Sequence, residues 1–216
     1  MIDLRALHQQ LRALHGPQGW WWPGEEPFEI AVGAVLVQRS RWEQAAAAIT
    51  ALRGPGLLEA EALAGADEED VRALVRPAGF PRTKPRRVQA LARWWDEHAD
   101  AAHELSDAAL RTELLGVEGV GEETADAISL YCFCRPAFLC DEYARRVLRA
   151  RGAMVPGSYR AFRRALEGVL AETEFEVAEL AELHGLIVEE GKTLRSSSAP
   201  PAVEPARSAA PPRARR

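Results

Sequence analysis

Residues 114–152 read LLGVEGVGEETADAISLYCFCRPAFLCDEYARRVLRARG, and they contain the most informative pattern of the chain. Apolar residues recur at helical spacing on both sides of Gly119-Val120-Gly121, which predicts two helices joined by a tight turn. Glycine at both ends of the turn permits backbone angles that a side chain would forbid. The second helix should therefore start with uncovered backbone N–H groups, which form a favourable site for a phosphate.

An apolar run over residues 137–140 follows the second helix and ends at Asp141. The pattern of residues 143–151 predicts a basic amphipathic helix after it. Taken alone, Asp141 is the N-cap expected before such a helix, and the glycine turn is one of many that join helix pairs. The order of the two features along the chain is what indicates a function.

In this order the segments resemble the helix-hairpin-helix DNA glycosylases of the endonuclease III superfamily. The hairpin pattern of that family is matched by Val117, Gly119, Val120, Gly121, Thr124 and Ala125. Residues 140–147 match the segment around the family's catalytic aspartate, and the resemblance extends over about residues 28–192. It implies an endonuclease III-like, all-α fold of two helical lobes with a cleft between them. It also implies double-stranded DNA with a damaged base as the partner.

The same resemblance implies how the chain divides. Residues 1–24 and 135–195 are expected to form one discontinuous helical lobe. Residues 25–134 are expected to form a central lobe that contains the hairpin at about 111–134. Residues 196–216 are mostly Ser, Ala, Pro and Arg, with four arginines against one glutamate and so a net charge of +3. We expect this segment to be a disordered basic tail, because it cannot bury enough apolar surface to order itself.

Composition limits the other classes of protein. With 216 residues, of which 47% are hydrophobic, the chain can bury a core. No apolar run reaches membrane length and no signal peptide is recognisable, so we expect a cytoplasmic monomer without a membrane partner. The net charge of −5 is unfavourable for a nucleic-acid binder, so a DNA contact would need locally concentrated positive charge.

Asp141 is the candidate catalytic residue. Breaking an N-glycosidic bond develops positive charge on the deoxyribose, and a nearby carboxylate can stabilise that charge and orient or deprotonate water. Glu123 lies eighteen residues before Asp141, where the resemblance places a Schiff-base lysine in bifunctional members. The resemblance therefore implies a monofunctional glycosylase without strand-cleaving lyase activity.

Tryptophans predict the pocket for the damaged base. Trp21, Trp22 and Pro23 fit the Trp-Pro segment of 3-methyladenine-type members, and Trp42 lies where such members carry an aromatic residue. Two indoles can stack on a cationic alkylated purine, so a base such as 3-methyladenine is the predicted substrate. The alternative is that these tryptophans fill the core or the seam between the lobes.

Two other functions stay open. Within the enzyme class, the alternative is an oxidised-pyrimidine glycosylase of the endonuclease III type. Outside it, the alternative is a non-catalytic helix-hairpin-helix module that binds DNA for a partner. The acidic balance of the chain and the missing lysine at position 123 leave that alternative open.

Gln38 is the candidate intercalating residue. It follows an apolar helix predicted over residues 28–37 and matches the glutamine that, in the resembling family, enters the gap left by an extruded base. An amide supplies the donors and the acceptor that an orphaned base loses. The alternative is that Gln38 only ends the helix.

Contacts with the DNA backbone are predicted from the hairpin and from basic residues near helix starts. The candidates are Gly119, Val120, Gly121, Thr124, Arg82, Lys84 and Arg145. For the basic residues the alternative is solvated surface charge. Glu122 and Glu123 place negative charge beside the presumed phosphate site and oppose DNA binding there.

We expect no iron–sulfur cluster and no other protein-bound cofactor. Endonuclease III continues with four cluster-binding cysteines, whereas no cysteine follows Cys140 in this chain. Its other cysteines, Cys132 and Cys134, do not form a convincing metal site with Cys140. The resemblance implies one exception, a sodium or potassium ion bound by the backbone carbonyls of Val117 and Gly119.

Overall fold

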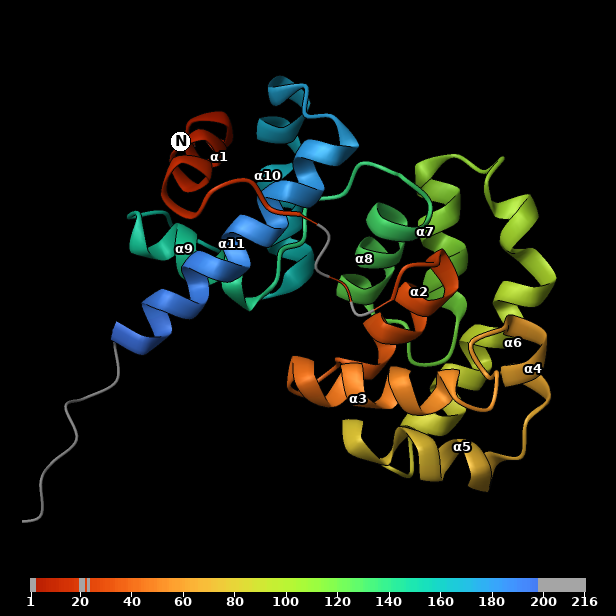
Figure 1. Ribbon diagram of the computed structural model, residues 1–216. Helices are drawn as coiled ribbons and strands as arrows, with labels where there is room; N and C mark the ends of the chain where they lie inside the picture. The colour runs from red at the N-terminus through yellow and green to blue at the C-terminus, as the bar shows by residue number, and fades with distance from the viewer. Residues whose placement is uncertain (1–2, 20–21, 23, 198–216) are drawn as a thin grey trace, which may run out of the picture.

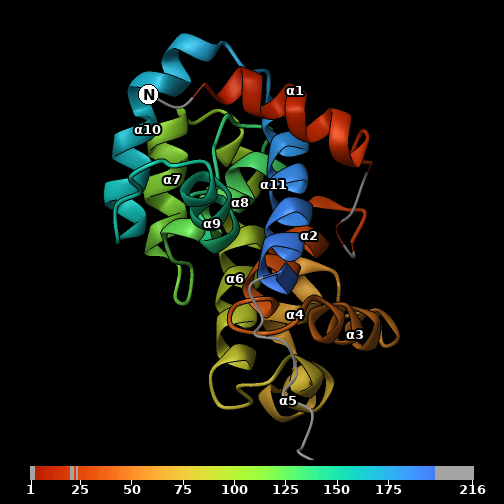
Figure 2. The ribbon, with the colours of Figure 1, turned by 90° about the vertical axis from the view of Figure 1, so that its left-hand side faces the viewer.

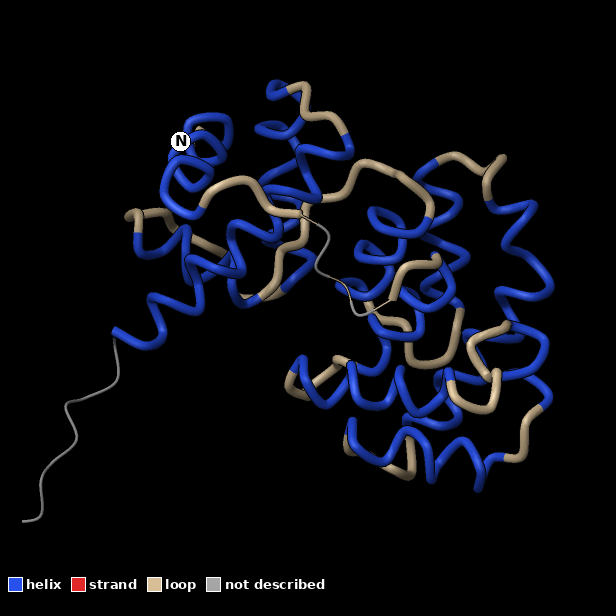
Figure 3. Tube along the Cα trace, viewed as in Figure 1, coloured by secondary structure: helices blue, strands red, loops and turns tan. Residues whose placement is uncertain are grey.

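The computed structural model describes residues 3–19, 22 and 24–197. Over these residues the chain forms eleven α-helices, one short 3₁₀ helix and no strand, which confirms the all-α prediction (Figures 1 and 3). None of the helices in this part of the chain combines the length and apolar character needed to cross a bilayer.

The helices follow one another with short connections. In chain order they are α1 (Leu4–His15), α2 (Pro27–Leu36), α3 (Trp42–Arg53), α4 (Ala60–Gly65), α5 (Glu68–Val75), η1 (Arg76–Ala78), α6 (Lys84–Ala102), α7 (Asp107–Gly116), α8 (Glu122–Cys132), α9 (Glu142–Ala150), α10 (Tyr159–Thr173) and α11 (Val177–Ser197).

Side-chain caps explain where several helices begin. Asp3 accepts a hydrogen bond from the Ala6 N–H at 2.8 Å, and Ser106 accepts one from the Ala109 N–H at 3.3 Å. Such caps satisfy backbone donors that the first turn of a helix leaves unpaired. Ser106, followed by Asp107 in the first turn, is the cap that the sequence predicts for the helix entering the hairpin, and this prediction is confirmed.

Two groups of helices form the two lobes. Helices α2–α8 lie together, and α1, α9, α10 and α11 form the second group, on the left in Figure 1. Within the second group, α11 packs against both α9 and α1, so segments far apart in sequence lie side by side (Figure 2). Helix α8 packs on α2 and also contacts α10 and α11, which places it where the lobes meet.

The two most buried helices follow from their sequences. In α2 every residue from Phe28 to Leu36 is buried, as expected for a helix that is apolar apart from Glu29, whose carboxylate pairs with Arg53 at 2.9 Å. In α8 every residue from Thr124 to Cys132 is buried. Because α8 carries polar side chains into this burial, those side chains must find partners inside the protein.

Two features predicted from the sequence differ in the structure. The spacing of Leu4, Leu7, Leu11 and Leu14 predicts one apolar face for the first helix; the first three are buried, whereas Leu14 is 66% exposed. Helix α11 runs through Ser197, two residues into the predicted tail. The rest of that tail, together with Trp21 and Pro23, lies outside the described residues.

Candidate functional site

The predicted hairpin is formed by α7, the turn after Gly116 and α8. Within the turn the Val120 N–H donates to the Val117 carbonyl at 3.0 Å. Gly119 has a φ of +88°, in the region that favours glycine, and a Cβ there would overlap the Arg87 side chain. The first glycine of the turn is thus required by the protein's own fold.

Gly121 has a different reason to be glycine. It is the N-cap of α8, with a φ of −92° and no side-chain cap. A Cβ built on it would meet no described atom within 4 Å, so the space beside the first turn of α8 is open. An anion can approach the backbone N–H groups of this helix start.

The two glycines give a matched test of the DNA interface. We expect Gly121→Ala to change the free energy of unfolding by less than about 1 kcal/mol but to weaken DNA binding by about tenfold, because its methyl group occupies the approach to the helix start. Gly119→Ala should instead lower stability by about 1–3 kcal/mol. Thermal unfolding and a DNA-binding titration measure the two effects. Equal DNA affinity of Gly121→Ala and wild type would contradict the assignment.

Gln38 holds the hairpin in this structure. Its Nε2 donates to the Gly119 carbonyl and to the Thr124 hydroxyl, both at 2.9 Å. Its Oε1 accepts from the guanidinium of Arg87 at 3.0 Å. Insertion of Gln38 into DNA stays a prediction, and Arg87 is a member of the site that the sequence did not reveal.

The side chains of two hairpin residues face inward. Val120 is 6% exposed and Thr124 is 7% exposed. A phosphate could therefore reach Thr124 only through its backbone N–H, and the N–H of Val120 is already donated to the Val117 carbonyl. The predicted contacts at Gly119, Val120, Gly121 and Thr124 reduce to contacts with the backbone of the turn and the start of α8.

The prediction for Lys84 is wrong. Its side chain is buried, and its Nζ donates to the carbonyls of Leu36 and Ala78 at 2.5 and 2.7 Å and to the Ser40 hydroxyl at 2.6 Å. Burial, together with the nearby charge of Arg87, lowers the pKa of Lys84 to about 8. The lysine joins the ends of α2 and η1 instead of reaching DNA.

The prediction for Arg145 also fails. Its side chain is buried on α9, where it donates to the Pro156 carbonyl and lies over the ring of Phe162, 5.2 Å from the centroid. A guanidinium held in this way supports the segment between α9 and α10. Arg82, by contrast, is exposed, and its contact with DNA stays a prediction.

The acidic residues beside the hairpin are not equivalent. Glu122 pairs with Arg160 at 3.0 Å and lies 3.9 Å from Arg111, so much of its charge is offset. Glu123 is accessible to solvent, yet desolvation by the surrounding protein, followed by the charge of Asp141, raises its pKa. Both effects lessen the repulsion of DNA that the sequence predicted.

An exposed aromatic residue lies near Gln38 and was missed from the sequence. Phe80 is 46% exposed, and the guanidinium of Arg39 lies 5.5 Å from its ring centroid. Both residues have positive φ, 52° for Phe80 and 55° for Arg39. Such backbone angles are costly for residues other than glycine and cluster at functional sites.

Asp141 is both an N-cap and the centre of a polar group. Its Oδ1 accepts from the Ala144 N–H at 2.7 Å, so the capping interpretation is confirmed. Its Oδ2 lies 3.6 Å from Nε2 of His184, and the residue is 8% exposed. Capping occupies one carboxylate oxygen and leaves the other to face His184.

A buried carboxylate fixes the segment before Asp141. Asp126 on α8 accepts from Arg111 Nε at 2.7 Å and from the Tyr159 hydroxyl at 2.8 Å. The same hydroxyl accepts from the N–H of Cys140 at 3.4 Å. The residue next to Asp141 is thereby tied to the second helix of the hairpin.

Of the predicted pocket residues, Trp22 and Trp42 can be placed. Trp22 is buried and Trp42 is half-buried, with ring centroids 5.1 Å apart and planes at 61°. Trp22 also lies edge-on to Tyr131, at 5.3 Å and 64°. The hydroxyl of Tyr131 lies 2.7 Å from Nδ1 of His184, so the aromatic group reaches Asp141 through two side chains.

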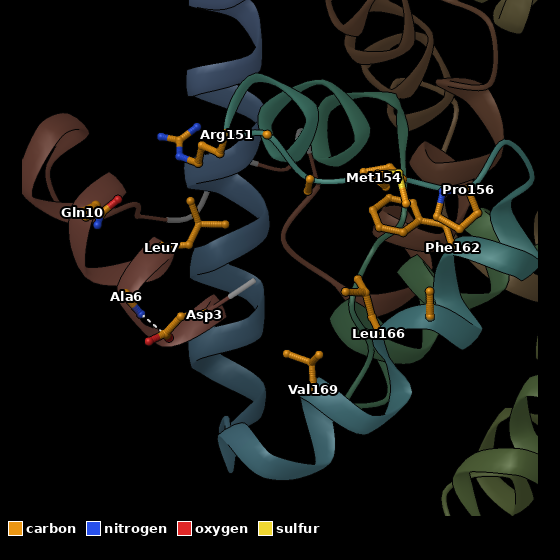
Figure 4. Close-up of a pocket in the computed structure, with 14 residues that line it drawn as sticks. Asp3, Ala6, Leu7, Gln10, Arg151, Met154, Pro156, Phe162, Leu166 and Val169 are labelled. Atoms are coloured by element: carbon orange, nitrogen blue, oxygen red, sulfur yellow. Dashed lines mark hydrogen bonds between the residues drawn. The ribbon is translucent and has the colours of Figure 1, made fainter. Parts of the chain in front are cut away.

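A cavity of about 630 Å³ lies elsewhere, between α1, α10 and the segment that joins α9 to α10 (Figure 4). Leu7, Met154, Phe162 and Leu166 are among the residues that line it, and Met154 is almost fully exposed. None of the residues predicted for the site lines this cavity, so it is separate from the group around Asp141.

Comparison with known sequences places this geometry in context. A family model described as the HhH-GPD superfamily base excision DNA repair protein matches residues 32–172. A Methanocaldococcus jannaschii protein named "Putative DNA repair glycosylase" is 33% identical over 192 residues, which cover 86% of each chain. Endonuclease III of Sulfolobus acidocaldarius is 28% identical over 174 residues, 80% of this chain and 76% of its own.

Two solved structures share the fold. One is H. pylori 3-methyladenine DNA glycosylase bound to 1,N6-ethenoadenine, with a TM-score of 0.72, 24% identity, and coverage of 89% of this chain and 98% of the other. The second is a trapped covalent intermediate of endonuclease III with DNA, with a TM-score of 0.73, 18% identity, and coverage of 93% and 92%. The fold is therefore endonuclease III-like, as predicted.

Proposed function

The chain belongs to the HhH-GPD superfamily of base excision DNA repair proteins, and from this premise we propose that it is a monofunctional DNA glycosylase. Its proposed substrate is double-stranded DNA that contains an alkylated purine such as 3-methyladenine. The observation that supports this most is the position of Asp141, which is linked through His184 and Tyr131 to the ring of Trp22.

In the proposed reaction Asp141 faces the deoxyribose of an extruded nucleotide. As the bond between sugar and base breaks, its electron pair leaves with the base and positive charge develops on the sugar ring. The carboxylate stabilises that charge and takes the proton of the water that attacks the sugar carbon. The N-cap hydrogen bond from Ala144 to Oδ1 supports this role, because it fixes the direction of the carboxyl group.

The aromatic group supports an alkylated purine as the substrate. Trp42, which is half-buried and packs against the buried Trp22, can offer ring surface to a planar cation, and such a base leaves with little help from an acid. The H. pylori relative of similar fold is a 3-methyladenine glycosylase crystallised with 1,N6-ethenoadenine. The similarity to endonuclease III of Sulfolobus acidocaldarius keeps an oxidised pyrimidine as the second candidate.

We propose that the hairpin binds the DNA backbone. The open start of α8 beside Gly121 would bind a phosphate through N–H groups, and the protein is proposed to act as a monomer. We propose a sodium or potassium ion at the carbonyls of Val117 and Gly119. Each accepts one hydrogen bond, from Val120 and Gln38, and keeps a second lone pair for a cation. The ion would hold the turn in shape and favour a nearby phosphate, and no iron–sulfur cluster is proposed.

Borohydride trapping tests the monofunctional part of the proposal. Lyase chemistry needs an amine that attacks the sugar, and position 123 is a glutamate. The chain has two lysines, of which Lys84 is buried and Lys192 lies on α11. We expect no covalent adduct when the protein is incubated with abasic DNA and borohydride. A trapped adduct that disappears in Lys84→Met or Lys192→Met would establish a lyase.

A panel of duplexes, each with one defined lesion, tests the substrate. Alkali-labile sites should appear in the duplex with an alkylated purine and not in undamaged DNA. Sites only in duplexes with oxidised pyrimidines would favour the endonuclease III-type activity. Binding to every duplex without release of any base would favour the non-catalytic DNA-binding module.

A further inference from the structure

The polar group around Asp141 includes two further buried side chains, those of His184 and Tyr131. We propose that His184 is a positioning residue for Asp141 and that Tyr131 holds His184 in the required orientation. This inference rests on the proposed function, in which Asp141 is the catalytic carboxylate. It assigns a task to two residues that lie on different helices, α8 and α11.

The contacts form a continuous path through the protein. The Tyr131 hydroxyl lies 2.7 Å from Nδ1 of His184 and 3.4 Å from the Ala181 carbonyl. On the other side of the imidazole, Nε2 lies 3.6 Å from Oδ2 of Asp141. Tyr131 and His184 are 9% and 8% exposed, so water has little access to this path.

The chemistry of the three groups indicates which atom donates a proton and which accepts it at each contact. A tyrosine hydroxyl is the donor when it faces an unprotonated ring nitrogen, and burial raises the pKa of Tyr131, so the hydroxyl keeps its proton. If Tyr131 donates to Nδ1, the proton of a neutral imidazole lies on Nε2 and points toward Asp141 Oδ2. At 3.6 Å, Nε2 and Oδ2 are slightly too far apart for a hydrogen bond. A small movement of either side chain when DNA binds can form it.

A purely structural role does not account for this arrangement as well. The neighbours of His184 on α11 are apolar and buried, namely Leu183, Leu186 and Ile187. A leucine would fill such a position without the cost of burying two ring nitrogens. The polar side chain is useful here because the carboxylate that it faces already has its other oxygen fixed by Ala144.

The path also connects the proposed base pocket to the carboxylate. Tyr131 lies edge-on to Trp22. A base that stacks on the tryptophans would therefore contact the aromatic group that includes Tyr131, the residue that orients His184. Asp141 and the pocket are then linked through His184, Tyr131 and Trp22, and the carboxylate is aimed correctly when the pocket holds a base.

The kinetic test uses three variants and a matched control. His184→Leu should lower the single-turnover rate of base release by roughly 10- to 100-fold with a change in DNA affinity below about threefold. His184→Gln keeps a donor near the position of Nε2 and should recover most of that rate. Tyr131→Phe should lose about tenfold. The control is His8→Leu, which removes a buried histidine that pairs with Glu182 at 2.8 Å, two residues before His184 on α11, and should lower stability without slowing release.

Nitrogen-15 NMR of the free protein tests the inference independently of any substrate. Wild-type His184 should carry a proton on Nε2 while Nδ1 accepts from Tyr131, and Tyr131→Phe should give a mixture of tautomers. A proton fixed on Nδ1, or equal rate losses in His184→Gln and His184→Leu, would overturn the proposal. If wild type released no base from any lesion, the proposed function would fail while the NMR result still decided the orientation of His184.

Discussion

Asp141→Asn is expected to lower the rate of base release from methylated duplex DNA by about 1,000-fold or more, which corresponds to about 4 kcal/mol of transition-state stabilisation. The amide keeps an oxygen that can accept the Ala144 N–H, so the N-cap and the fold should persist. What it loses is the negative charge opposite the sugar and the group that accepts a proton from water. Single-turnover release of free base measures the effect.

Glu123→Gln is the matched control for this substitution. Glu123 is the other carboxylate whose charge acts on the site, and desolvation by the surrounding protein and the charge of Asp141 already raise its pKa. Because Glu123 has no role in the proposed reaction, its amide variant should retain activity within about tenfold of wild type. If Glu123→Gln lost as much activity as Asp141→Asn, the assignment of a single catalytic carboxylate would be wrong.

Lys84→Met should lower the free energy of unfolding by about 2–4 kcal/mol, because two buried carbonyls and one hydroxyl lose their donor. Methionine fills nearly the same space, so the loss reports hydrogen bonding and not a cavity. Chemical denaturation measures it. Lys192→Met is the control, because Lys192 is the other lysine of the chain, is exposed and pairs with Glu189 on the surface. It should change stability by less than about 1 kcal/mol.

The pH dependence of this effect has a definite sign. An unfolded lysine titrates near pH 10.5, and burial lowers the folded pKa of Lys84 to about 8. Between these values the unfolded chain binds more protons, so this residue makes wild-type stability rise with pH, and below pH 8 its charge opposes folding. The difference between wild type and Lys84→Met should therefore grow from pH 7 to pH 10. Unchanged stability together with weaker, less salt-dependent DNA binding would instead restore the phosphate contact predicted from sequence.

The fold was largely readable from the sequence because its main elements have strong local signals. The apolar run before Gln38, the glycine turn and the Ser106 cap each predicted a helix or its boundary that the structure contains. Such signals depend on residues close together in the chain. The division of the chain at about residue 135 follows from the resemblance to the glycosylase family, and the structure places α8 where the two helix groups meet.

The errors concern residues whose environment is set by distant segments. A lysine or an arginine near a helix start looks the same in sequence whether it faces water or two carbonyls from other helices. Lys84 finds acceptors in Leu36 and Ala78, and Arg145 finds one in Pro156, so both charges are turned inward. No spacing rule encodes these partners, because they depend on how α2, η1 and α6 pack and on how the segment after α9 folds back on that helix.

The polar path behind Asp141 was missed for a related reason. Tyr131 appeared as one more residue of an apolar helix and His184 as part of the final helix. The available signal was the hydroxyl itself, since a tyrosine within a wholly buried helix needs a partner. The identity of that partner required the packing of α8 on α11, which the structure supplies.

Binding to a positively charged abasic-site analogue tests the role of Asp141 most directly. A duplex that carries a pyrrolidine in place of one sugar presents a protonated nitrogen where positive charge develops in the reaction, and an uncharged tetrahydrofuran duplex is its control. Wild type should bind the pyrrolidine duplex at least about tenfold more tightly than the tetrahydrofuran duplex, and Asp141→Asn should bind the two equally. Equal affinity of the wild-type protein for both duplexes would contradict a catalytic carboxylate at position 141.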